Sequence, residues 1–274
     1  MTPTPPSHHL ISKTMKTMTR QEYNQHEGIN YSLLKKFAIS PAYYQWYLSQ
    51  PKTEPSSEMK IGLATHTLSL TPELFIQEYA VAPKVDRRTK EGKEVWNDFV
   101  AASGGKTVLT EEEFDTARRC TAAWVESSLY KIHVLGKDTL IEKAFFGKHI
   151  SPSGSVVTKG IPDIFIPDKG IIIDLKTFGE TPTPEKMRYA ALRSEYLGQA
   201  AYYKKLVEDN GFKFNAFIFA FIEKAEPNSI NFLSPLDSTL IQAQDKLNVL
   251  LERFINCKAA DIYPSTDNGT IHTI

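Results

Sequence analysis

The chain has 274 residues, of which 41% are hydrophobic and 23% are charged. This is an ordinary globular composition, and the length fits one large domain or two small ones. Lysine plus arginine and aspartate plus glutamate both number 32, so the net charge is zero. A neutral chain argues against a large non-specific surface for nucleic acid, but it leaves room for a local basic patch.

The cysteines and the apolar stretches indicate the compartment. Cys120 and Cys257 are far apart and form no CxxC pair, so we expect no cysteine zinc site and a reducing environment. The N-terminus lacks the apolar run of a signal peptide. The longest apolar stretches, such as residues 216–222, are too short to cross a bilayer. The sequence therefore predicts a cytoplasmic protein with no membrane association.

The first half of the chain is predicted to be mainly helical. Residues 1–27 have the composition of a flexible tail. Helices are expected over 30–37, 44–48 and 61–70. A polar loop is expected over 49–60, between the second and third of these helices. A charged loop is expected over 82–93, and a long helix runs from Thr110 toward Val134. Thr110 and Glu113 have the spacing of a capping box.

The pattern changes to strands after residue 139. Three predicted strands, joined by short turns, form an antiparallel meander: 139–150, 155–166 and 170–177. A helix over 184–210, an internal strand over 215–222 and a helix over 236–256 follow. The fold class is α/β, with one mixed β-sheet flanked by helices and a helical N-terminal portion. We predict a single domain over 28–265, with a helical part at 28–135, a catalytic part at 136–260 and a C-terminal tail at 266–274.

Charged residues converge on two of these strands. Asp174 and Lys176 are two residues apart on the third strand, so they share one face of the sheet. The turn at 167–170 brings Asp163 of the second strand close to Asp174. Two carboxylates and an ammonium suit phosphodiester hydrolysis, because carboxylate oxygens bind Mg²⁺ and the lysine stabilises developing charge. Two surface aspartates beside a hairpin, with a solvated lysine, explain the pattern equally well.

Other polar residues can join this group. Glu142 lies on the neighbouring strand and can supply a metal oxygen, although an exposed strand charge is the commoner case. Gln199 and Tyr203 share a helix face and can hold a DNA phosphate or base, or simply interrupt an apolar face. His66, in a helix of small residues, is either a metal ligand or a buried core histidine.

Taken together, these residues form a motif set. It comprises G-x-A-x-H at 62–66, Glu142, G-I-P-D at 160–163, D-L-K at 174–176 and Q-x-x-x-Y at 199–203. The set resembles the PD-(D/E)xK nuclease superfamily, and within it the RecE-type and RecB-type exonucleases. The helix start at 29–44 and the loop at 86–93 are similar too. The resemblance covers roughly residues 28–260.

The resemblance implies a 5′→3′ exonuclease on linear double-stranded DNA that leaves 3′ single-stranded overhangs and depends on Mg²⁺ or Mn²⁺. It implies that His66, Asp163 and Asp174 hold the metal, that Lys176 acts at the attacking water, and that Gln199 and Tyr203 support the site. It also implies a phage or prophage origin, a homo-oligomeric ring around DNA, and a single-strand annealing recombinase as partner. Asp174 stands where many members carry glutamate. The sequence has no cysteine cluster, which argues against the iron–sulfur members of the RecB group.

Two further features fit DNA. The loop at 82–93 carries five cations, among them Arg87, Arg88, Lys90 and Lys93, which either contact phosphates or are simply solvated. The aromatics at 43–47 can stack on unpaired bases, although core packing is the commoner use. A sequence-specific or structure-specific endonuclease and a catalytically inactive DNA-end-binding protein remain the alternative functions.

Overall fold

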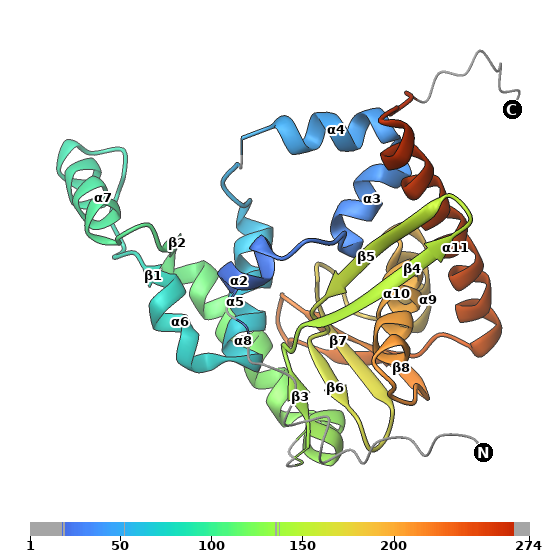
Figure 1. Ribbon diagram of the computed structural model, residues 1–274. Coiled ribbons are helices and arrows are strands. Elements are labelled where there is room, and N and C mark those ends of the chain that lie inside the picture. The colour runs from blue at the N-terminus through green and yellow to red at the C-terminus, as the bar shows by residue number, and fades with distance from the viewer. Residues whose placement is uncertain (1–17, 19, 52, 135, 137, 266–274) are drawn as a thin grey trace, which may run out of the picture.

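The fold is built around a five-stranded mixed sheet with helices on both faces (Figure 1). The computed structural model describes residues 18, 20–51, 53–134, 136 and 138–265. The strand order is β3-β6-β7-β8-β9, and the bounds are β3 (Leu140–Ile141), β6 (Ile164–Ile166), β7 (Ile171–Phe178), β8 (Ala216–Glu223) and β9 (Ile230–Leu233). Only the β7–β8 pair is parallel within this sheet. The predicted α/β class with one mixed sheet is confirmed.

The two faces of the sheet pack against different helices. Ile172 of β7 and the phenylalanines of β8 belong to a cluster that contains side chains of α3 (Tyr31–Ile39), α10 (Tyr196–Asp209) and α11 (Asp237–Ala260). The alternate residues, such as Ile173 and Ile222, pack against Trp124 of α8 (Glu111–Glu126). Since β8 is buried on both faces and lies between β7 and β9, the expectation that it is internal is confirmed.

The first two strands of the predicted meander are each divided in two. The outer halves, β4 (Phe145–Ser151) and β5 (Gly154–Gly160), form a separate antiparallel ribbon. The inner halves are β3 and β6, which continue into β7 as an antiparallel series. Both strands break at the same level, because Glu142 adopts a left-handed backbone conformation with φ 45° and Pro162 cannot donate a ladder hydrogen bond. The expected uninterrupted strands are therefore wrong.

Several helices also differ from the expectation. The helix predicted over 184–210 is two helices, α9 (Pro184–Arg193) and α10, separated by Glu195 with φ 56°. The long helix from Thr110 ends at Glu126, with a π-helical turn, η1 (Tyr130–Val134), after it. The Thr110–Glu113 capping box is present. The remaining helices begin and end close to the expected residues: α4 (Pro41–Ser49), α5 (Ser57–Leu70) and α11.

Some elements were not expected at all. Residues 82–93 end in a helix, because Thr89 caps the N-terminus of α7 (Lys90–Ala102). Three short elements were also missed: α6 (Pro72–Glu78) and the parallel pair β1 (Tyr79–Val81) and β2 (Thr107–Leu109). The predicted N-terminal tail ends in α2 (Arg20–Gln25), whereas residues 1–17 and 266–274 lie outside the described part. Within the described part, no helix meets the length and hydrophobicity needed for a membrane span.

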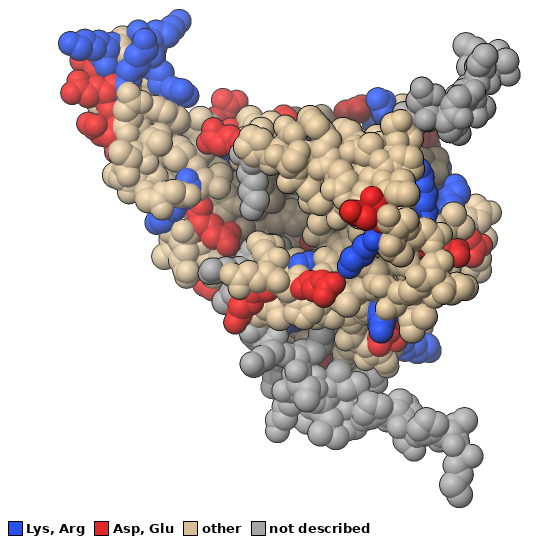
Figure 2. Space-filling view, turned by 45° about the horizontal axis from the view of Figure 1, so that its top comes forward, with Lys and Arg blue, Asp and Glu red and all other residues tan. Residues whose placement is uncertain are grey.

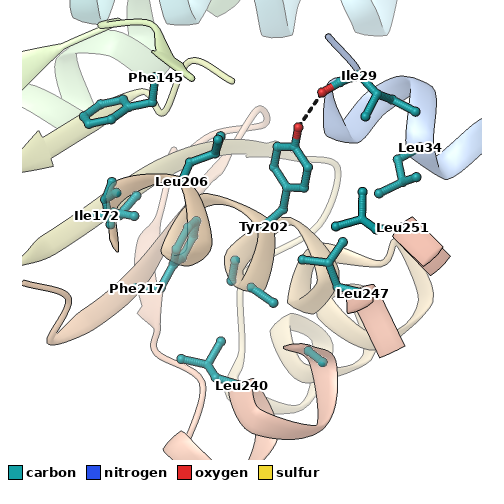
Figure 3. Close-up of a cluster of buried hydrophobic side chains, with 14 of the residues drawn as sticks. Ile29, Leu34, Phe145, Ile172, Tyr202, Leu206, Phe217, Leu240, Leu247 and Leu251 are labelled. Atoms are coloured by element: carbon teal, nitrogen blue, oxygen red, sulfur yellow. Dashed lines mark hydrogen bonds between the residues drawn. The ribbon is translucent and has the colours of Figure 1, made fainter. Parts of the chain in front are cut away.

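A buried tyrosine joins the N-terminal helices to the central core (Figure 3). The side chain of Tyr202 on α10 is 1% exposed. Its hydroxyl donates to the carbonyl of Ile29 at 2.5 Å and accepts from the N–H of Lys159 at 3.1 Å. The backbone of residues 29 and 158 also forms a bridge. Tyr202 therefore holds the start of α3 and the ribbon strand β5 against α10.

We expect Tyr202→Phe to lower the free energy of unfolding by about 0.5–1.5 kcal/mol, because it removes the buried hydrogen bonds of the hydroxyl. The Ile29 carbonyl and the Lys159 N–H keep their bond to each other at 2.9 Å. Chemical denaturation monitored by circular dichroism measures this change. Tyr189→Phe is the matched control, since Tyr189 is 61% exposed and its hydroxyl accepts from Arg193 on the surface. An equal effect of the two substitutions would contradict the role given to the Tyr202 hydroxyl.

Candidate active site

The two aspartates meet where the sheet and the ribbon separate. Asp163 lies in the bend immediately before β6, and Asp174 lies within β7. The register pairs Ile164 with Ile173, so the acids are neighbours across two adjacent strands. The N–H of Leu175 donates to Oδ2 of Asp163 at 2.7 Å. This bond fixes the first carboxylate against the strand that carries the second.

Lys176 lies on the same face of β7 as Asp174, as the sequence predicted. Its ammonium contacts Oδ1 of Asp174 and donates to Oε1 of Gln199 at 3.0 Å. Gln199 in turn donates to Oδ2 of Asp174 at 3.4 Å. The ammonium also lies 4.7 Å from the ring centroid of Tyr196. One amide from α10 thus holds both the acid and the lysine in place.

His66 reaches the site from α5. Its Nε2 lies 2.9 Å from the carbonyl of Leu175, and its Nδ1 lies 3.4 Å from Oδ2 of Asp163. A donor at Nε2 leaves Nδ1 facing the carboxylate. The helix can lie this close because residue 62 is glycine, where a Cβ would come within 3.2 Å of Thr177 Oγ1. The G-x-A-x-H motif therefore places an imidazole beside Asp163.

Tyr203 packs under the site with the glycine of G-I-P-D. A Cβ at Gly160 would come within 2.8 Å of Tyr203 Cε1 and 2.7 Å of Leu206 Cδ1. The absence of a side chain at residue 160 therefore lets α10 approach the ribbon. Burial, with the nearby charges of Asp174 and Asp163, raises the pKa of Tyr203 well above its usual value. The phenol stays neutral at all working pH values.

The electrostatics of the four charged groups are interdependent. Burial raises the pKa of Asp174 to about 6, while the Lys176 ammonium opposes the rise and the Asp163 charge adds to it. Burial also acts against the charge on Asp163, but His66 and Lys176 outweigh it and lower the pKa of that carboxyl. The pKa of His66 is raised, because Asp163 outweighs the effect of burial. One acid therefore stays ionised, and the other holds its charge at a cost.

The donor chemistry of the site fits a hard divalent cation. Asp174 is 2% exposed, and its Oδ1 accepts no hydrogen bond of acceptable geometry, although the Lys176 ammonium lies against it. Carboxylate oxygens and an imidazole are suitable ligands for such an ion. Within the described residues, His, Cys, Asp and Glu side chains form no preassembled group of three ligands. The observed ion pair instead supplies positive charge to the buried oxygen.

The backbone of Glu142 contacts the residue that carries the first carboxylate. Its N–H donates to the carbonyl of Asp163 at 2.9 Å. Its carboxylate accepts from Thr71, the residue that ends α5, at 3.4 Å. The bend at Glu142 therefore brings a third acid to the same rim of the sheet.

The predicted DNA-binding cations lie away from this cluster. Figure 2 shows a group of Lys and Arg side chains, in blue, at a tip in the upper left of the view, where Figure 1 places α7. Lys90 and Lys93 belong to α7 rather than to a loop. The Arg87 guanidinium lies 4.0 Å from the ring centroid of Trp96, and Arg88 pairs with Asp86. No described contact connects these four cations to Asp163 or Asp174.

A pocket of about 390 Å³ opens beside Lys176. Its lining includes Gln199 and Tyr203 and also residues that the sequence analysis did not single out, namely Tyr31, Lys35 and Tyr196. Lys35 donates to the carbonyl of Ser194 at 3.0 Å. Tyr31 and Lys35 are four residues apart on α3, which is a sequence signal for a shared face. Their position in the pocket beside Lys176 depends on how α3 packs.

Solved structures of two other proteins are similar to this chain. A crystal structure of a protein assigned as an exonuclease from Eubacterium rectale superposes with a TM-score of 0.62 at 16% identity, over 94% of this chain and 96% of that one. A phage-related exonuclease from Haemophilus somnus 129PT gives a TM-score of 0.35 at 14% identity, over 87% of this chain and 98% of that one. No curated protein sequence matches the chain significantly.

At such identities the Eubacterium rectale structure bears on the fold alone. The family model described as PDDEXK-like domain of unknown function (DUF3799) matches residues 30–271. That range contains the ribbon, the mixed sheet and every residue of the acidic cluster. The chain therefore belongs to this PDDEXK-like family.

Proposed function

We propose that the protein is a divalent-metal-dependent exodeoxyribonuclease. The observation that carries the proposal is the convergence of Asp163, Asp174 and Lys176 at the adjacent strands β6 and β7, beside an open pocket. Buried charges are costly unless they are used or paired. The family and its exonuclease-like relatives support hydrolysis of a phosphodiester as that use.

Each side chain has a role that its contacts support. Asp163 and Asp174 would hold the cation, with His66 and Glu142 as further ligands at the same rim. Mg²⁺, or Mn²⁺ in its place, would polarise the phosphoryl oxygen and lower the pKa of a bound water. Lys176 would stabilise the charge that develops on the phosphate and orient the attacking water. Gln199 keeps that ammonium aimed, and Tyr203 supports the helix that carries Gln199.

The finer parts of the proposal rest on the resemblance. We propose 5′→3′ digestion of linear duplex DNA, which leaves a 3′ overhang for a single-strand annealing recombinase. A ring-shaped homo-oligomer and a phage or prophage origin stay predictions. The tip formed by Arg87, Arg88, Lys90 and Lys93 would contact backbone phosphates of the duplex. The salt dependence of duplex binding by an Arg87→Ala, Arg88→Ala variant tests that contact, since each lost phosphate contact lowers the slope by about 1.

The experiment compares three substrates with and without EDTA. Linear duplex labelled at the 5′ end, linear duplex labelled at the 3′ end and closed circular duplex are each incubated with the protein and Mg²⁺. We expect early loss of the 5′ label and an intact circle, and EDTA stops the reaction. Early loss of the 3′ label would reverse the polarity. Cutting of the circle would indicate an endonuclease, and binding without any hydrolysis would indicate an inactive DNA-end-binding protein.

A further inference from the structure

Three aromatic side chains of α4 lie at the surface. Trp46 is 53% exposed, Tyr47 is 41% exposed, and the half-buried Tyr43 has its ring centroid 5.2 Å from that of Trp46. Large aromatic side chains stabilise a fold mainly when they are buried. We call Tyr43, Trp46 and Tyr47 the α4 aromatic array.

The array is presented by a helix that is anchored elsewhere. Its three residues have the spacing i, i+3 and i+4, which places them on one helix face. Tyr44, between them in sequence, makes ring contacts with Phe37, Phe254 and Tyr263. The core therefore uses Tyr44 to hold α4. The neighbouring aromatics remain accessible, because they point to a different side of the helix.

The chain segment that carries the array has only positive charges. Residues 30–50 contain Lys35 and Lys36 and no aspartate or glutamate. The Lys36 ammonium lies 4.9 Å from the ring centroid of Tyr47. Figure 2 shows a broad surface without charged residues in the upper part of the view, next to a hollow in the middle of this face. Aromatic faces with adjacent cations suit a flexible polyanion that carries π-systems.

The array is also continuous with the candidate active site. Lys35, the residue before Lys36, lines the pocket that contains Lys176, and its ammonium donates to the carbonyl of Ser194, the residue that ends α9. The series of cations therefore runs from Lys176 through Lys35 and Lys36 to the ring of Tyr47. A protein partner that covered the array would not need this connection to the pocket.

We propose that the α4 aromatic array binds single-stranded DNA as it enters or leaves the active site. Unpaired bases stack on Trp46 and Tyr47, and backbone phosphates lie beside Lys35 and Lys36. Stacking of this kind is tolerant of sequence, because every base has a π-face. The inference rests on the proposed nuclease function, and it adds the form of the DNA and the residues that hold it.

Direct binding tests the proposal apart from catalysis. The full chain with Asp174→Asn, kept in EDTA, is titrated into a labelled oligothymidylate of about 12 nucleotides and, separately, into a blunt duplex. Adding Trp46→Ala and Tyr47→Ala is expected to weaken oligothymidylate binding about tenfold or more, from the loss of base stacking. Duplex binding is expected to change by less than about twofold, because phosphate contacts dominate there.

Two companion variants separate stacking from general surface change. Trp46→Phe with Tyr47→Phe keeps aromatic faces and is expected to retain most of the affinity for the oligothymidylate. Ile241→Ala with Val249→Ala removes two exposed apolar side chains from α11, where they are 61% and 68% exposed, and is expected to leave binding unchanged. Thermal unfolding of each variant confirms that the fold is intact.

Three results would overturn the proposal. The alanine pair could bind the oligothymidylate as tightly as the parent, or it could lose single-stranded and duplex DNA equally. It could also change the oligomeric state in solution, which would identify the array as a protein interface. If the unsubstituted protein hydrolyses no DNA, the proposed nuclease function fails. The binding comparison still decides whether the array binds single-stranded DNA.

Discussion

Asp174→Asn is expected to lower the rate of DNA hydrolysis by at least about a thousandfold, because removal of one charged ligand sacrifices several kcal/mol of metal-dependent transition-state stabilisation. Lys176→Ala is expected to lower it by about 100–1,000-fold, the usual cost of a lost electrostatic donor. The measurement is the initial rate of acid-soluble nucleotide release from linear duplex in Mg²⁺. Asp174 is 2% exposed, so solvent cannot replace its carboxylate, whereas Lys176 lines the open pocket.

Metal binding distinguishes the two roles. Calorimetric titration with Mn²⁺ is expected to show much weaker binding to Asp174→Asn and near-normal binding to Lys176→Ala. Asp245→Asn, an exposed acid on α11, is the matched control and is expected to keep both hydrolysis and metal binding. Wild-type rates from Asp174→Asn would remove this acid from the reaction. Equal metal affinities of the two active-site variants would show that the assigned roles are wrong.

The part of the site that depends on strand register could be predicted from the sequence. Asp174 and Lys176 share a face because they are two apart on one strand, and a short turn brings Asp163 alongside. Local periodicity is sufficient for these three residues. The spacing of Gln199 and Tyr203 predicts a shared helix face and leaves open whether they join the site, and the structure bonds Gln199 to both Lys176 and Asp174.

The remaining features depend on tertiary packing. The bend at Glu142 has a left-handed backbone, which its sequence neighbours do not demand. The break before α10 lies at Glu195, which follows a good helical pattern and has no glycine to mark it. Helix α7 was missed because its first turn, Lys90–Lys93, has the charged composition of a loop. Lys35 gained its place in the pocket only when α3 packed against the start of α10.

The stability of the metal-free protein should reflect the strain of ionising Asp174. The pKa of this carboxyl is raised from 3.8 to about 6, chiefly by burial. A group whose pKa is higher in the folded state binds more protons there, so its contribution to stability falls as the pH rises from about 4 to above 6. A rise of this size corresponds to about 3 kcal/mol of folding free energy. The raised pKa of His66 acts in the same direction above pH 6.5.

The thermal midpoint of the wild-type protein in EDTA, relative to that of Asp174→Asn, is therefore expected to fall between about pH 4 and about pH 6.5. The difference between the two proteins reports on residue 174 together with the neighbours whose pKa its charge shifts, His66 and Lys176. Saturating Mn²⁺ is expected to remove the fall for the wild type, because a bound cation favours the ionised carboxylate and competes with protons. A difference that does not vary with pH in EDTA would show that Asp174 carries no ionisation strain. Ionised Asp174 would then cost the metal-free fold nothing at neutral pH. A cation that stabilised the protein would do so chiefly through Asp163 and His66.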